Sequence, residues 1–106
     1  MKTVAMEAGS YGIRANAIAP GCVEGDRING VIEREAAQKN TSSDIVRQAY
    51  KAGTSLNTFI EAKDIAAMAV FLASKSASLV SGQIIAVDGH TAVSYTHLTL
   101  PTIPTV

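Results

Sequence analysis

Two short apolar segments, each ended by a turn, place the strongest limit on how this chain can fold. Residues 13–19 alternate apolar with small or polar side chains and stop at Pro20, and residues 83–87 are almost wholly apolar and stop at Asp88. Both patterns are typical of short strands. Because a long segment separates them, we expect parallel strands joined by a right-handed crossover, and hence a layered α/β fold.

Helical spacing of apolar residues accounts for most of the segment between these strands. One such pattern covers residues 28–36, and a second covers residues 45–53 behind a serine or threonine cap at Thr41 or Ser42. The second pattern places Ile45, Val46, Ala49 and Tyr50 on one side. A third helix is expected over residues 62–74, with a buried stripe formed by Ile65, Met68, Ala69 and Leu72.

The ends of the chain differ from its middle. Residues 2–7 favour a helix stopped by Gly9, and because they follow Met1 directly we interpret them as the last turns of something longer. Residues 92–106 carry no charge and have no apolar partner, so we interpret them as an unrelated or disordered tail. Translated sequencing-adapter DNA is an alternative origin for this tail, and we assign it no function.

Composition excludes several classes of partner. The 106 residues suffice for one small domain, and nine basic residues balance nine acidic ones, which argues against nucleic acid and against an acidic membrane surface. A lone cysteine, Cys22, cannot form an internal disulfide, and no segment has the length of a signal peptide core or a membrane span. The sequence therefore predicts a cytoplasmic protein with a small-molecule ligand. No spacing of potential ligands predicts a metal site.

Three stretches in a fixed order, "YGIRANAIAPGCVEG", "DIAAMAVFLAS" and "SGQIIAVDG", carry a family resemblance. Residues 2–91 resemble the C-terminal part of a short-chain dehydrogenase/reductase. The resemblance implies the C-terminal part of a Rossmann-like, doubly wound parallel sheet, here two strands plus helices. It also implies that residues 1–91 form part of one domain and that residues 24–60 form its substrate lid.

The resemblance further implies a cofactor, NAD or NADP, held at the end of the first strand. Pro20 ends that strand, and Gly21 leaves room for a flat ring to approach the main chain. The backbone amide and carbonyl of Val23 would then pair with the nicotinamide carboxamide. Gly25 stands where many members have a threonine, so one cofactor contact of the family is in doubt here.

No catalytic residue is assigned in this chain. The family's glycine-rich loop and its catalytic serine, tyrosine and lysine would all precede the matched region. Tyr11 and Tyr50 do not replace that tyrosine, because neither has a lysine four residues later. Cys22 is expected to be a packing residue, and His90 a surface or subunit-contact residue.

The resulting hypothesis is a fragment of an NAD(P)-dependent oxidoreductase that interconverts an alcohol and a ketone, and that is inactive alone. Substrates such as 3-oxoacyl groups, sugars and ring alcohols remain open, and the full-length enzyme is expected to be a homo-oligomer. The alternative is a noncatalytic truncated module that assembles with a full-length relative. Of the polar residues near the first strand, Asn16 is expected to hydrogen-bond loop backbone and Arg14 to lie at the sheet edge or surface.

Overall fold

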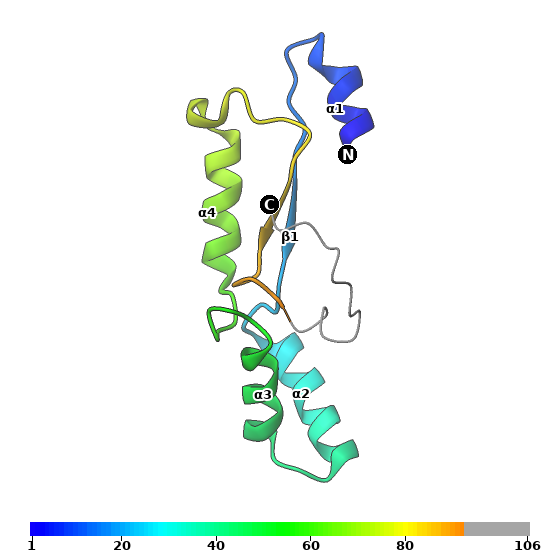
Figure 1. Cartoon of the computed structure of the whole chain (residues 1–106), viewed down its shortest axis with the longest axis vertical. Helices are drawn as coiled ribbons and strands as arrows, with labels where there is room; N and C mark the ends of the chain where they lie inside the picture. The colour runs from blue at the N-terminus through cyan, green and yellow to red at the C-terminus, as the bar shows by residue number, and fades with distance from the viewer. Residues whose placement is uncertain (93–106) are drawn as a thin grey trace, which may run out of the picture.

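The computed structural model describes residues 1–92, so all of the predicted tail except Ala92 lies outside the described residues. The elements in chain order are α1 (Lys2–Gly9), β1 (Ala17–Pro20), α2 (Asp26–Lys39), α3 (Ser43–Ala52), α4 (Ala62–Ala73), a 3-10 turn (Lys75–Ala77) and β2 (Ile84–Val87). In Figure 1 the strands run through the middle, α4 lies along one side, and α2 and α3 project from one end. No helix within residues 1–92 is both long and apolar enough to span a bilayer.

The sheet consists of β1 and β2, which pair in parallel from Ala17 opposite Ile84 to Pro20 opposite Val87. The predicted α/β arrangement of two parallel strands is thus confirmed. The predicted start of the first strand at residue 13 is wrong. Residues 13–16 lie opposite a loop, because β2 does not begin until Ile84.

Side-chain hydrogen bonds tie residues 14–16 to that loop, together with one backbone bond from the Gly82 amide to the Ala15 carbonyl at 2.7 Å. The amide Nδ2 of Asn16 donates to the Val80 carbonyl at 2.9 Å, and its Oδ1 accepts from the Gln83 amide at 3.1 Å. The Arg14 guanidinium donates to the same Val80 carbonyl at 3.1 Å. The predicted role of Asn16 is confirmed, and Arg14, which we expected at the sheet edge or surface, is half-buried against this loop.

Helix α4 packs on one face of the sheet. The helix begins at Ala62, as predicted from the acidic residues near its start. The Glu61 amide donates to the Asp64 carboxylate at 2.9 Å and so caps this end. The expected buried stripe is only partly formed: Leu72 is buried, Ile65 and Met68 are half-buried, and Ala69 is exposed. A sheet of two strands is too narrow to cover the whole stripe.

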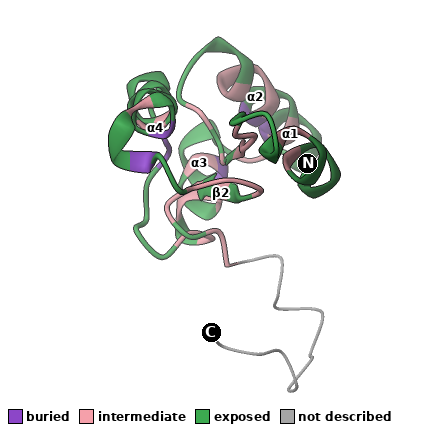
Figure 2. Cartoon of the chain, turned by 90° about the horizontal axis from the view of Figure 1, so that it is seen from above, coloured by how far each residue is buried: buried purple, intermediate pink, exposed green. Residues whose placement is uncertain are grey.

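The opposite face of the sheet is bare within residues 1–92, where no other helix packs on either strand. Ile84 is 62% exposed as a result. An apolar run like residues 83–87 is typical of a strand that is covered on both faces, but within residues 1–92 only one face of β2 is covered by a helix. Figure 2 shows that most of the ribbon over the described residues is exposed or intermediate.

The main hydrophobic core lies in the α2–α3 hairpin, away from the sheet. Its buried members are Ile32, Ala36, Val46 and Phe59, with Ile28 and Tyr50 packed against them. Ser42 caps α3 as predicted, its hydroxyl accepting from the Ile45 amide at 3.2 Å. Ile45 itself is 63% exposed, so the expectation that it shares the buried side of this helix is wrong.

A hydrogen bond from the Tyr50 hydroxyl to the Glu35 carboxylate, 2.7 Å long, links the two helices of the hairpin. This bond, helped by the Lys39 ammonium 3.0 Å from the same carboxylate, holds the pKa of Glu35 below its ordinary value of 4.5. The Glu35 carboxylate in turn raises the pKa of Tyr50 above its ordinary value of 10.0. Each group therefore favours the folded state only while the carboxylate is charged and the phenol is neutral.

We expect Tyr50→Phe to lower the free energy of unfolding near neutral pH, and this loss to shrink in acid. The stabilisation from Glu35 is complete above its ordinary pKa of 4.5 and disappears as the pH falls through the lowered folded value. Urea unfolding at a series of pH values measures the difference between wild type and variant. Tyr11→Phe is the matched control, because Tyr11 is exposed and its hydroxyl has no hydrogen-bond partner among residues 1–92. A difference for Tyr50→Phe that is constant from neutral pH down to about pH 2 would contradict the expectation.

Candidate functional site

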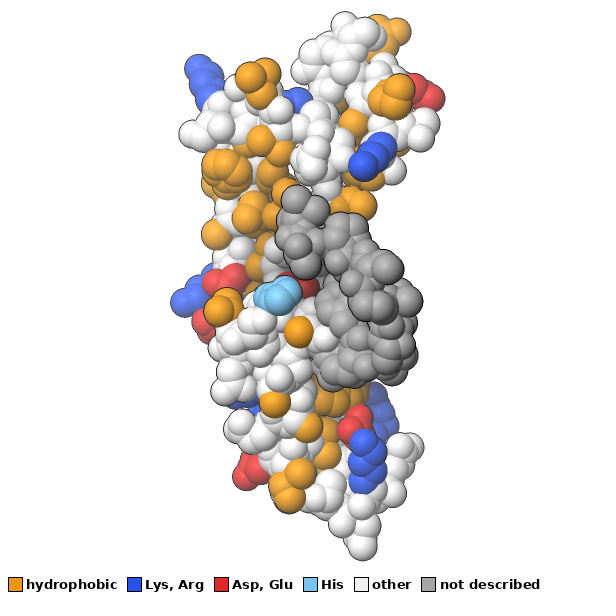
Figure 3. Space-filling model, viewed as in Figure 1, with side chains coloured by type: hydrophobic (Ala, Val, Ile, Leu, Met, Phe, Trp, Pro, Cys, Tyr) orange, Lys and Arg blue, Asp and Glu red, His pale blue; other side chains and the backbone are white. Residues whose placement is uncertain are grey.

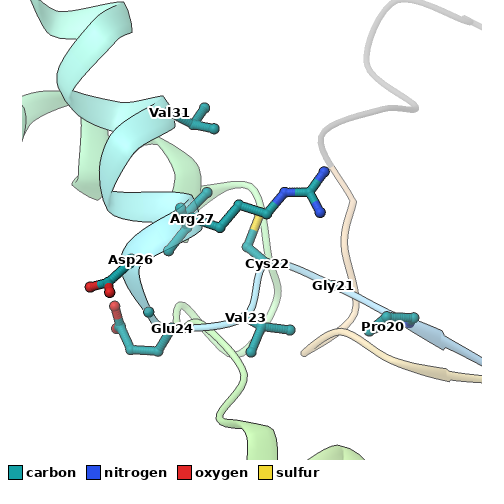
Figure 4. Close-up of a pocket in the computed structure, with 10 residues that line it drawn as sticks. Pro20, Gly21, Cys22, Val23, Glu24, Asp26, Arg27 and Val31 are labelled. Carbon is teal, nitrogen blue, oxygen red and sulfur yellow. The ribbon is translucent and has the colours of Figure 1, made fainter.

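A cavity of about 420 Å³ opens where β1 ends and α2 begins. Its lining comes from residues 20–28 together with Val31, and Figure 4 shows several of these side chains. All three residues predicted to contact the cofactor, Pro20, Gly21 and Val23, line this cavity. The structure thus brings the predicted site residues together at the carboxyl end of β1, which is the edge where open α/β sheets hold ligands.

Gly21 lies where the ends of the two strands come closest. Its amide donates to the Val87 carbonyl at 2.9 Å, and a β-carbon built at Gly21 would lie 2.7 Å from the β-carbon of Asp88. The sequence interpretation explained this glycine by the approach of a flat ring. In the structure, the close passage of Asp88 already requires it, whether or not a ring is bound.

Val23 presents an unused edge of backbone. It forms an isolated parallel bridge with Ile60, in which the Ile60 amide donates to the Cys22 carbonyl at 2.9 Å and the Glu24 amide donates to the Ile60 carbonyl at 2.8 Å. In such a bridge the amide and carbonyl of Val23 itself point away from Ile60. Within residues 1–92 neither group has a hydrogen-bond partner, so one donor and one acceptor are available side by side.

Gly25 sets the direction in which the chain leaves this site. It stands at the N-terminal cap of α2 with φ of 150° and ψ of −172°, a region that is essentially restricted to glycine. A threonine here, as in many members of the family that the sequence resembles, would need a different backbone. The departure at Gly25 therefore changes the geometry of the loop as well as removing a hydroxyl.

The remaining residues singled out from the sequence lie in different places. Cys22 is exposed and lines the cavity, so the expectation that it is a packing residue is wrong. Tyr11 is also exposed. The Tyr50 hydroxyl donates a hydrogen bond to the Glu35 carboxylate inside the hairpin. His90 is exposed, and its Nδ1 is paired with the Ser55 hydroxyl, which ties the loop before α4 to the end of β2.

Sequence reasoning missed the two backbone bridges that anchor the hairpin to the sheet. Ile60 pairs with Val23 at one side, and Thr54 pairs with Thr91 at the other. The sequence around these residues carries no local signal for either bridge, since each bridge joins segments more than thirty positions apart. The unused edge of Val23 follows directly from the first of these bridges.

Comparisons with known proteins identify the family of this chain. A sequence model described as "Enoyl-(Acyl carrier protein) reductase" matches residues 1–90. The crystal structure of a short chain dehydrogenase family protein from Francisella tularensis superposes with a TM-score of 0.77 at 28% identity, covering 83% of this chain and 36% of that one. The chain belongs to the short-chain dehydrogenase/reductase family. Its two strands and helices are the C-terminal part of the Rossmann-like fold of that family.

Two further proteins that are similar to this chain are informative. The 3-oxoacyl-(acyl-carrier-protein) reductase FabG of Chlamydia muridarum is 34% identical over 88 residues, which are 83% of this chain and 31% of that protein. A blue fluorescent protein from a metagenomic library, solved in complex with NADPH, has a TM-score of 0.66 at 31% identity, covering 87% of this chain and 32% of that one. This chain thus spans about a third of the length of each of these proteins.

Proposed function

We propose that this chain supplies the nicotinamide-contacting strand end and the substrate lid of an NAD(P)-dependent oxidoreductase that interconverts an alcohol and a ketone. The unused backbone edge of Val23, beside the cavity, is the observation that carries the proposal. A nicotinamide carboxamide has one acceptor oxygen and an amino group that donates, and it therefore complements one amide and one carbonyl on adjacent backbone. The metagenomic relative solved with NADPH supports a cofactor of this class.

The α2–α3 hairpin suits the role of a lid over residues 24–60. Its core is internal, and neither helix packs against α4 or the strands, so within residues 1–92 the hairpin is joined to the sheet through its base alone. Ile28 and Val31 place apolar side chains of α2 in the cavity wall. A lid of this kind excludes water from a hydride transfer and contacts the substrate. The substrates proposed from the family remain 3-oxoacyl groups, sugars and ring alcohols.

The first test is a binding measurement on the isotope-labelled chain. Nicotinamide riboside is expected to shift the Val23 amide and carbonyl resonances, because the carboxamide would pair with both. Ribose alone is the control ligand, and the amide of Gly12, which does not line the cavity, is the control resonance. Shifts that are the same with ribose and with nicotinamide riboside would contradict the proposal.

We further propose that the 106-residue chain does not turn over substrate by itself. No tyrosine in it is followed four residues later by lysine, the pair that supplies the proton in the family it belongs to. Assays with NADH or NADPH and a panel of ketones are therefore expected to show no oxidation above a no-protein blank. Reduction of any of these ketones by the purified chain would overturn this part of the proposal.

A noncatalytic module that assembles with a full-length relative is the second candidate. Its supporting observation is the exposed apolar surface of α4 and the strands: Val70, Phe71 and Ile84 are 71%, 46% and 62% exposed. Figure 3 shows hydrophobic side chains gathered over α4. The same surface is where we propose that the full-length enzyme forms a homo-oligomer. Light scattering of the chain, alone and mixed with a full-length relative, tests this candidate, which requires mixed oligomers.

A cytoplasmic location remains a prediction.

A further inference from the structure

Arg27 places a positive charge in the cavity, on the side away from the nearby carboxylates. It lies in the first turn of α2 and lines the cavity. In Figure 4 its guanidinium extends past Cys22, whereas the carboxylates of Glu24 and Asp26 lie on the other side of the loop. Acidic and basic groups that share this short segment are therefore separated in space.

The charge of Arg27 has no partner within residues 1–92. Glu24 and Asp26 are the carboxylates nearest to Arg27 in the sequence. Glu24 already pairs with Arg47, whose Nη1 lies 2.9 Å from the Glu24 carboxylate. Neither carboxylate lies within salt-bridge distance of Arg27. The helix does not account for this residue either, because a cation in the first turn opposes the positive end of the helix dipole.

We propose that Arg27 recognises an anionic oxygen group, phosphate or carboxylate, on a ligand bound in this cavity. A guanidinium suits this task because its planar array of N–H donors matches two oxygens of either group. This inference rests on the proposed function, which places a nicotinamide at the Val23 edge of the same cavity. The anionic group then belongs either to the phosphate of the cofactor or to an acidic substrate, and ligand pairs that differ only in this group distinguish the two.

Arg34 provides a matched control on the same helix. It is exposed and, like Arg27, has no ion-pair partner within residues 1–92. It lies seven residues further along α2, about two turns away on a similar face, and it does not line the cavity. An effect of the general charge of the helix would appear in both arginine variants, whereas recognition in the cavity would be lost only in the Arg27 variant.

The experiment compares the wild-type chain with Arg27→Gln and Arg34→Gln by resonance shifts of the cavity amides. Nicotinamide mononucleotide against nicotinamide riboside tests a cofactor phosphate, and the keto acid levulinate against butanone tests a substrate carboxylate. We expect the anionic member of at least one pair to bind the wild type and Arg34→Gln about three- to tenfold more tightly at low salt. Arg27→Gln is expected to remove this advantage, and added salt to weaken it.

The outcomes separate this inference from the proposed function. If neither anionic ligand loses affinity in Arg27→Gln, or if Arg34→Gln loses as much, the inference is overturned. If levulinate binding depends on Arg27 while nicotinamide riboside leaves Val23 unshifted, the anion site stands and the proposed nicotinamide contact fails. If the mononucleotide alone depends on Arg27, the group recognised is the phosphate of the cofactor.

Discussion

Ile32→Ala is expected to lower the free energy of unfolding of the α2–α3 hairpin by about 2–5 kcal/mol, the usual cost of truncating a buried isoleucine. Ile32 is 1% exposed and is the largest side chain in the chain's described part that is fully buried. It packs with Val46 and Phe59, and within residues 1–92 neither α2 nor α3 packs against any other helix or strand. A small core has little capacity to close the cavity that the truncation leaves.

Hydrogen exchange of the hairpin amides and urea unfolding measure this loss. Ile45→Ala is the matched control, since it makes the same kind of truncation in the same hairpin at a side chain that is 63% exposed. Its effect is expected to stay within about 0.5 kcal/mol. Equal losses for the two variants would show that the hairpin does not have the core described here, and the interpretation of the hairpin as a self-supporting lid would fail with it.

Gly21→Ala is expected to destabilise the sheet by about 1–3 kcal/mol, the range for forcing an extra carbon into a packed site. The added β-carbon would meet Asp88 at 2.7 Å and 2.8 Å, at its β-carbon and α-carbon. Since one of these atoms is backbone, the strand ends must separate, and the bond from the Gly21 amide to the Val87 carbonyl must lengthen.

Gly30→Ala is the control for the Gly21 substitution, with an effect of opposite sign. Gly30 lies inside α2, and a β-carbon there would meet only the end of the Arg34 side chain, at 3.4 Å. Alanine at such a helix position is expected to stabilise by about 0.5–1 kcal/mol. Thermal unfolding of both variants gives the comparison. A neutral Gly21→Ala would mean that the strand ends do not approach as described and that the ring-approach explanation of this glycine deserves preference.

The positions of the helices could be predicted from the sequence because their signals are local. Ser42 caps α3, Glu61 and Asp64 mark the start of α4, and the apolar spacing gives the course of each helix. The three stretches that carry the family resemblance are local patterns too. The same reasoning located the candidate site, because a proline and a glycine directly after a strand are visible in the sequence itself.

Strand ends and burial could not be predicted in the same way, because both depend on distant neighbours. The length of β1 is determined by where β2 begins, more than sixty residues later. Ala69 and Ile84 are apolar residues in patterns typical of burial, but both are exposed, because among residues 1–92 a single helix packs on the sheet and covers one of its faces. A hydrophobic pattern predicts which side chains favour burial, and the neighbours present decide which are buried.

The sequence alone predicted the α/β class, the order of the elements, the resemblance to the family and the candidate site at the end of β1, since each prediction rests on patterns of residues that lie close together in the chain. Only the tertiary structure decided that the close approach of Asp88 requires glycine at position 21. It also decided that pairing with Ile60 leaves the amide and carbonyl of Val23 unused, and that the Arg27 guanidinium lies away from the carboxylates of Glu24 and Asp26. These three facts depend on distances between segments that the chain brings together only by folding.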